Sequence, residues 1–209
     1  LGLMFPFQEF SGHFEYRHFN SKQLMGKLTE EQKKVLDNLV RIAGNSRVLG
    51  WYLADEPEMR NENPAWYAEC RAYLTKIDPY HPTLMLNCSI SGIRDYQDSA
   101  DILFPDYYPD YFDNGPRIPL NGTAAFIREA ARYKPAWGVI QAFVWMPEQR
   151  GGGAPGRPPT FAEIRNQFHQ VFAANGKGVF LYDFYHASQM FSVTRLAPDW
   201  LFAEGDRLK

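Results

Sequence analysis

The sequence predicts an α/β fold whose core is a parallel β-sheet, and three observations support this prediction. Short apolar runs alternate with longer segments of helical periodicity along the 209 residues. These runs are almost free of polar residues, as expected of strands that are covered on both faces. Polar and acidic side chains follow most of the runs, which is where a barrel of parallel strands carries its functional groups.

The periodicity of apolar residues defines the expected elements. Strands are expected at 1–7, 48–54, 83–87, 101–104, 137–145 and 178–182. Helices are expected at 21–43, 64–77, 93–96, 123–133 and 161–174. The first helix contains Thr29-Glu30-Glu31, which is typical of a helix start, and the second has one apolar stripe from Trp66 to Leu74. The third is brief because the link between its neighbouring strands is short.

An open, doubly wound sheet is the main alternative to a barrel. It predicts a glycine-rich phosphate-binding turn after an early strand. The glycine cluster of this sequence, Gly151-Gly152-Gly153, lies instead in the proline-rich loop 146–160. We therefore expect a (β/α)8 TIM barrel, of which this chain holds strands 3 to 8.

Six strands do not close an eight-stranded barrel. Residues 1–209 are therefore expected to form a single barrel domain that lacks its first two βα units. The chain opens on a strand-like run at Leu1 without a preceding Met. We expect a preceding segment or a neighbouring chain to complete the barrel, the alternative being a smaller open α/β sheet with protected edges.

Composition and charge argue against several classes of function. The net charge of −2 gives no electrostatic reason to expect nucleic acid or an acidic membrane surface as a partner. No apolar run is long enough to span a bilayer. Cys70 and Cys88 are too few for a disulfide framework, and the histidines lack metal-ligand spacing, so no cofactor is expected. The aromatic content of 16% suits a sugar-binding cleft as well as an aromatic core.

The strongest local motif is a buried strand that ends in two carboxylates and a proline. The apolar run from Val48 to Ala54 leads directly into Asp55-Glu56-Pro57. A carboxylic acid that is fixed at a strand end and partly buried is suited to general acid catalysis. Alternatively, the two acids cap the following helix, because acidic side chains are favoured near helix N-termini.

This stretch resembles the fourth-strand end of clan A glycoside hydrolases, where Asn-Glu-Pro holds the acid/base, with Asp55 in place of the Asn. Three further stretches are similar to those of a glycosidase-like group of barrels with an Asp-Glu-Pro motif: Asp106-Tyr107-Tyr108-Pro109, Gln141-Ala142-Phe143 and Asp78-Pro79-Tyr80-His81-Pro82. The resemblance covers nearly the whole chain. It implies a TIM barrel that hydrolyses O-glycosidic bonds, with Glu56 as general acid/base.

Hydrolysis of a glycosidic bond needs a second carboxylate beside the acid. The resemblance implies a nucleophilic glutamate in the seventh strand, but Gln141 occupies this strand, and an amide cannot be the nucleophile. Asp106 is the preferred partner of Glu56, and strand alternation points Asp55 the other way unless a bulge intervenes. The remaining candidates are Asp55, Glu148 and Asp183.

Polar and aromatic residues at the strand ends are candidates for binding an oligo- or polysaccharide substrate. They are Gln8, Asn87, Tyr107, Tyr108, Gln141, Trp145, Tyr182, Asp183 and Tyr185, with His186 beside them. We expect the strand-end residues to converge on one face of the barrel, and the protein to be extracellular or periplasmic. Two other functions stay open: a catalytically silent barrel that binds a glycan or has a structural role, and another barrel hydrolase or lyase.

Overall fold

The computed structural model describes residues 3–6, 26–43, 48–144 and 156–182. The chain divides into two compact units. The first unit is Leu1–Pro105 with Glu129–Ala136, and the second is Asp106–Arg128 with Trp137–Lys209. Each is described by itself below.

The first unit is built on a parallel sheet. Its strands are β1 (Leu3–Pro6), β2 (Val48–Asp55), β3 (Thr83–Asn87) and the first part of β4 (Ile102–Tyr107), paired in that order. The pairing of β2 with β3 shifts register between Tyr52 and Ala54, which marks a β-bulge just before the carboxyl end of β2.

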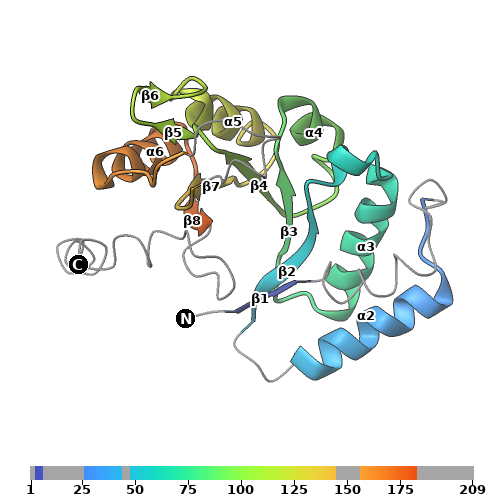
Figure 1. Cartoon of the computed structure of the whole chain (residues 1–209). Helices are drawn as coiled ribbons and strands as arrows, with labels where there is room; N and C mark the ends of the chain where they lie inside the picture. Colours follow the sequence, from blue (N-terminus) through green and yellow to red (C-terminus); the bar gives the residue numbers. More distant parts are fainter. Residues whose placement is uncertain (1–2, 7–25, 44–47, 145–155, 183–209) are drawn as a thin grey trace. The chain divides into compact units, whose positions relative to one another are not determined.

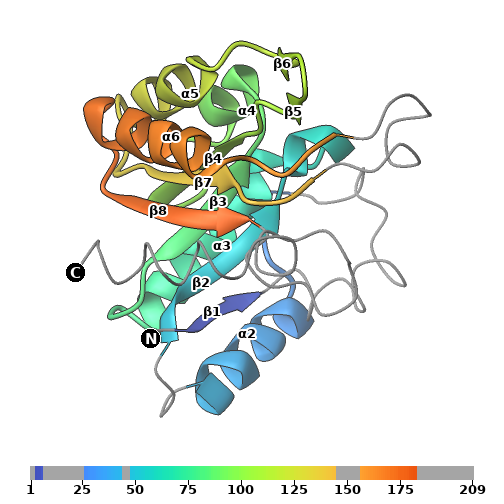
Figure 2. The same cartoon turned by 60° about the vertical axis from the view of Figure 1, so that its left-hand side comes forward.

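Helices α2 (Glu30–Ala43) and α3 (Pro64–Ile77) lie along the same side of β1, β2 and β3 (Figures 1 and 2). Their apolar faces pack on the sheet to form a core that includes Leu36, Trp51 and Trp66. Helix α3 begins where Asn63 accepts a hydrogen bond from the backbone N–H of Ala65, at 3.0 Å. Two short helices follow the carboxyl ends of strands: the 3₁₀-helix η2 (Pro57–Arg60) after β2 and α4 (Ile90–Asp95) after β3.

The second unit continues the parallel arrangement. The end of β4 pairs with β7 (Trp137–Gln141), and β7 pairs with β8 (Gly178–Tyr182). Its helices are α5 (Gly122–Ala130) and α6 (Phe161–Ala173). Helix α6 comes close to β7 because residue 138 is glycine: a Cβ there would lie 2.4 Å from Cγ2 of Val171.

A short antiparallel hairpin, β5 (Tyr111–Phe112) with β6 (Gly115–Pro116), is tied to the start of α6. Arg157 makes a two-pronged ion pair with Glu163, at 2.7 and 2.8 Å, and its backbone N–H donates to Tyr111 O at 2.8 Å. Glu163 also completes a capping box with Thr160. One arginine therefore links the hairpin to the cap of α6.

The predicted α/β class and the parallel sheet are confirmed, with the strand order β1-β2-β3-β4-β7-β8. The structure has α3, β3 and β8 at the predicted bounds. Helix α4 begins three residues earlier than predicted, because Ser89 caps it by accepting from Gly92 N–H at 2.9 Å. The hairpin β5–β6 was not predicted, since two-residue strands carry no readable periodicity. None of the helices in the described ranges has the length and apolar character needed to cross a membrane.

Candidate active site

Glu56 has a strained backbone at the carboxyl end of β2. Its φ of 45° and ψ of 54° lie in the left-handed region, which is uncommon for a residue other than glycine. Non-glycine residues with this conformation are found more often at functional sites. Its backbone N–H donates to Leu86 O of β3 at 3.2 Å. The half-buried side chain stands at the cap position of η2 but makes no capping hydrogen bond. Helix capping therefore does not account for this glutamate.

Asp55 is exposed, and its Oδ1 accepts a hydrogen bond from the Tyr52 hydroxyl at 3.0 Å. Residues three apart in a regular strand point to opposite faces. The bulge between Tyr52 and Ala54 adds one residue to the strand and so brings Tyr52 and Asp55 to the same side. This bulge lies before Asp55 and does not change how Asp55 points relative to Glu56, so a functional role of Asp55 stays a prediction.

Glu58 connects the loop after β2 to the end of β3. Its Oε2 accepts from Asn87 Nδ2 at 2.9 Å, and its Oε1 accepts from Cys88 N–H at 2.8 Å and Ser89 Oγ at 3.4 Å. Glu58 was not predicted from the sequence to be a site residue. Its place two residues after Glu56, in the loop that follows a strand, was the available signal.

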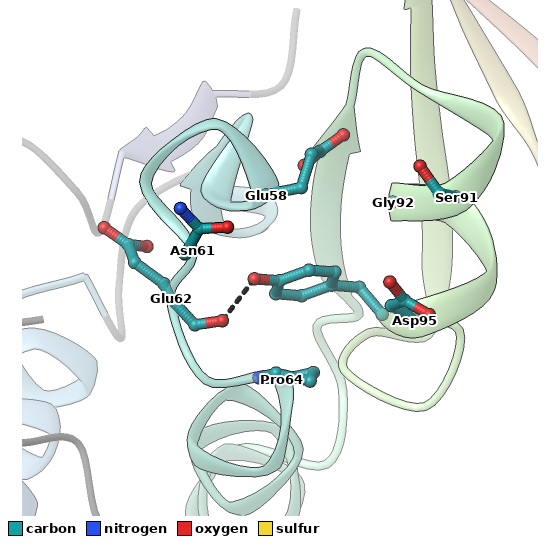
Figure 3. A pocket seen from close by; sticks show the side chains of 8 residues that line it. Glu58, Asn61, Glu62, Pro64, Ser91, Gly92 and Asp95 are labelled. Atoms are coloured by element: carbon teal, nitrogen blue, oxygen red, sulfur yellow. Dashed lines mark hydrogen bonds between the residues drawn. The ribbon is translucent and has the colours of Figure 1, made fainter. Parts of the chain in front are cut away.

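A cavity of about 490 Å³ lies between η2 and α4 in the first unit (Figure 3). Tyr96, whose hydroxyl donates to the backbone oxygen of Glu62, is buried and lines this cavity. Burial and the nearby carboxylates of Glu62 and Glu58 raise the pKa of Tyr96. The lining includes Glu58 and Asp95 but not Glu56, so the candidate acid does not belong to this cavity.

Asp106 and Tyr107 end β4 in the second unit, with Asp106 almost fully buried and paired in register with Val139. The hydroxyl of Tyr107 donates to Pro119 O at 2.8 Å, and its ring packs edge-on against Phe126. A Cβ at residue 122, which is glycine, would lie 1.9 Å from this ring. Burial raises the pKa of the Tyr107 hydroxyl. These contacts give Tyr107 a packing role on α5.

Gln141 is fully buried at the end of β7, and both the oxygen and the nitrogen of its side-chain amide make hydrogen bonds. Its Oε1 accepts from Asp110 N–H at 2.8 Å, and its Nε2 donates to Phe143 O at 3.0 Å. Its backbone N–H donates to the Gln167 side chain at 3.1 Å. Asp110 has a left-handed backbone with φ of 67°, so Gln141 holds a tight turn after β4.

Three aromatic rings meet at the ends of β4, β7 and β8. Tyr108 and Tyr182 stack with their planes 24° apart and their centroids 6.0 Å apart, and Phe143 is edge-on to both, at 5.0 and 5.5 Å. Tyr182 is 45% exposed. The structure thus brings together two predicted binding residues and adds Phe143, which was not predicted to bind substrate.

The predicted site residues are distributed over both units and the part of the chain outside the described ranges. In the first unit Asp55, Glu56 and Asn87 lie at the carboxyl ends of neighbouring parallel strands, and in the second unit Asp106, Gln141 and Tyr182 do so. Convergence of the two groups stays a prediction. The residues outside the described ranges are Gln8, Trp145, Glu148, Asp183, Tyr185 and His186.

No known family model and no curated protein matches the chain. Among solved structures, it is similar to a protein assigned as an α-L-fucosidase from Bacteroides thetaiotaomicron, with 14% identity, coverage of 85% of this chain and 60% of that chain, and a TM-score of 0.57. A protein assigned as a β-galactosidase from Bacteroides fragilis gives 14% identity, 78% and 25% coverage, and a TM-score of 0.54. The GH2 β-galacturonidase from Eisenbergiella tayi gives 16% identity, 73% and 29% coverage, and a TM-score of 0.51.

These similarities concern the fold, which is glycosidase-like. The chain spans 60% of the length of the first of these structures and 25–29% of the other two.

Proposed function

We propose that this chain is a glycosidase-like hydrolase of O-glycosidic bonds in which Glu56 is the general acid/base. The observation that carries the proposal is the conformation of Glu56: a left-handed residue at the carboxyl end of a parallel strand, whose side chain does not cap the following helix. The fold shared with glycosidases supports it. We also propose that the six parallel strands correspond to strands 3 to 8 of a (β/α)8 barrel, so that residues 1–209 hold part of a single barrel domain.

In this proposal Glu56 protonates the leaving oxygen, and Asp106 is the second carboxylate. Protonation by a positioned acid assists departure of the leaving group, while the partner acts as a nucleophile or activates a water. Burial of Asp106 suits it to a site from which bulk water is excluded. The exposed ring of Tyr182 would stack on the apolar face of a sugar, with Tyr108 and Phe143 packed against it.

A panel of nitrophenyl glycosides tests the proposed activity on the full chain. We expect release of nitrophenol from at least one of the α-L-fucoside, β-D-galactoside and β-D-galacturonide, which correspond to the activities named for the similar structures. Heat-denatured protein is the control. If every glycoside stays intact over prolonged incubation, the hydrolase proposal is wrong.

Tyr182 provides a test of the aromatic platform. Removal of its ring in Tyr182→Ala is expected to raise KM for the hydrolysed glycoside about 10-fold with little change in kcat, because stacking stabilises ground state and transition state alike. Tyr80→Ala, which removes a ring that is 89% exposed in the first unit, is the matched control. An unchanged KM in Tyr182→Ala would exclude this residue from sugar binding.

A glycan-binding barrel without catalysis is the second candidate function. Gln141 favours it, because the side chain in the strand where the resemblance implies a nucleophile is a buried amide with both ends in hydrogen bonds. This function predicts that glycans bind, as measured by calorimetry, without hydrolysis of any member of the panel.

A further inference from the structure

We infer that Glu58 is a positioning residue: it sets the orientation of the Asn87 amide so that the Asn87 carbonyl oxygen is left as the acceptor for a substrate hydroxyl. The substrate part of this inference rests on the proposed function. The orientation part rests on the structure of the first unit alone.

The contacts of Glu58 hold its carboxylate in one place. Three donors from the end of β3 converge on it: Asn87 Nδ2 at 2.9 Å, Cys88 N–H at 2.8 Å and Ser89 Oγ at 3.4 Å. On the other side is Gly92 of α4, where a Cβ would lie 2.2 Å from Oε1 of Glu58 (Figure 3). The glycine makes room for the carboxylate, and the three hydrogen bonds keep it there.

The Glu58 carboxylate, by accepting these hydrogen bonds, fixes the orientation of the Asn87 amide. It can only accept, so the NH₂ group of Asn87 must turn toward it and the carbonyl oxygen Oδ1 must turn away. Asn87 is 0% exposed, and within the described part of the chain its Oδ1 has no hydrogen-bond partner. An unpaired buried acceptor is destabilising and rare in native proteins.

The location of this acceptor suits a ligand. Asn87 is the last residue of β3, and ligands of parallel barrels bind at the carboxyl ends of the strands. A sugar hydroxyl can donate to Oδ1 and supply the missing hydrogen bond. Glu58 also belongs to the same turn as Glu56, whose backbone N–H donates to Leu86 O. One loop therefore carries the proposed acid, Glu56, and orients the acceptor, Asn87 Oδ1.

A double-mutant cycle tests the inference by reversing donor and acceptor. In Glu58→Gln the remaining oxygen stays with the Cys88 N–H, which can only donate, so the new Nε2 faces the NH₂ group of Asn87. The Asn87 amide then turns over, which replaces the acceptor with a donor. In Asn87→Asp two carboxylates face each other. In Glu58→Gln/Asn87→Asp the glutamine donates to the aspartate, and the second aspartate oxygen restores the acceptor.

Each single variant is expected to lower Tm by roughly 5 °C, and the double variant to regain most of the loss. For the glycoside that the wild type hydrolyses, Glu58→Gln should raise KM about 10-fold, with recovery in the double variant. Glu31→Gln and Asn38→Asp, at exposed positions of α2, are the matched controls. If a single variant does not fold, folding of the double variant is the deciding observation.

The stability cycle separates failure of this inference from failure of the proposed function. If the wild type hydrolyses no glycoside, the function fails, while the Tm values still test the orientation of Asn87. Losses in Tm that simply add in the double variant would overturn the inference, because a packing role of Glu58 predicts no recovery. Recovery of Tm with a KM that never changes would overturn the substrate part.

Discussion

Glu56→Gln is expected to reduce hydrolysis about 10³-fold while leaving Tm within about 1 °C of the wild-type value, in line with the usual contribution of a general acid and the small effect of an isosteric change. Glutamine keeps the size of the side chain and removes the proton that the leaving oxygen needs. The side chain makes no capping hydrogen bond to η2, so the helix loses no cap.

Two glutamate-to-glutamine controls separate chemistry from structure. Glu31→Gln, at an exposed position, should change neither rate nor stability. Glu58→Gln should lower Tm, because it disturbs hydrogen bonds to the end of β3. Full activity in Glu56→Gln would remove Glu56 as the acid, and a loss of activity that parallels a loss of Tm would indicate a structural role.

Gln141→Glu places a carboxyl group where the resemblance implies a nucleophile, and we expect it to lower Tm by roughly 10 °C at neutral pH without creating activity. The oxygen that replaces Nε2 would face Phe143 O, to which Nε2 donates at 3.0 Å. Gln141 is 0% exposed, so a charge there would lose its hydration.

The loss of stability should depend on pH in a defined direction. Burial and the facing carbonyl oxygen raise the pKa of the introduced glutamate in the folded state above its unfolded value of about 4.3. Below the unfolded-state pKa the protonated carboxyl can donate to Phe143 O, and the loss of stability is small. It grows as pH rises toward the folded-state pKa and then becomes constant.

Gln141→Met is the control, since it removes both hydrogen bonds without adding a titratable group. The difference in Tm between the two variants should widen from pH 4 to pH 7. New hydrolytic activity in Gln141→Glu with an unchanged Tm would show that this position serves catalysis rather than the turn at Asp110.

The sequence by itself determined the fold class and most of the longer elements. Helix α3 and strands β3 and β8 have the predicted bounds, because apolar periodicity and capping residues are local properties of the chain. The motif Asp55-Glu56-Pro57 could be placed at the end of β2 for the same reason. The hairpin β5–β6 could not be predicted, because its strands are too short to have a pattern.

Only the tertiary structure decided what the candidate site residues do within each unit. Gln141 was predicted to bind substrate. In the structure its side-chain amide instead makes hydrogen bonds to the backbone of Asp110 and Phe143. The contacts of Glu58 could not be predicted, because the donors that it accepts from lie about thirty residues further along the chain. Side-chain hydrogen bonds between distant segments depend on strand register and on bulges such as the one at Tyr52, and no local pattern in the sequence encodes them.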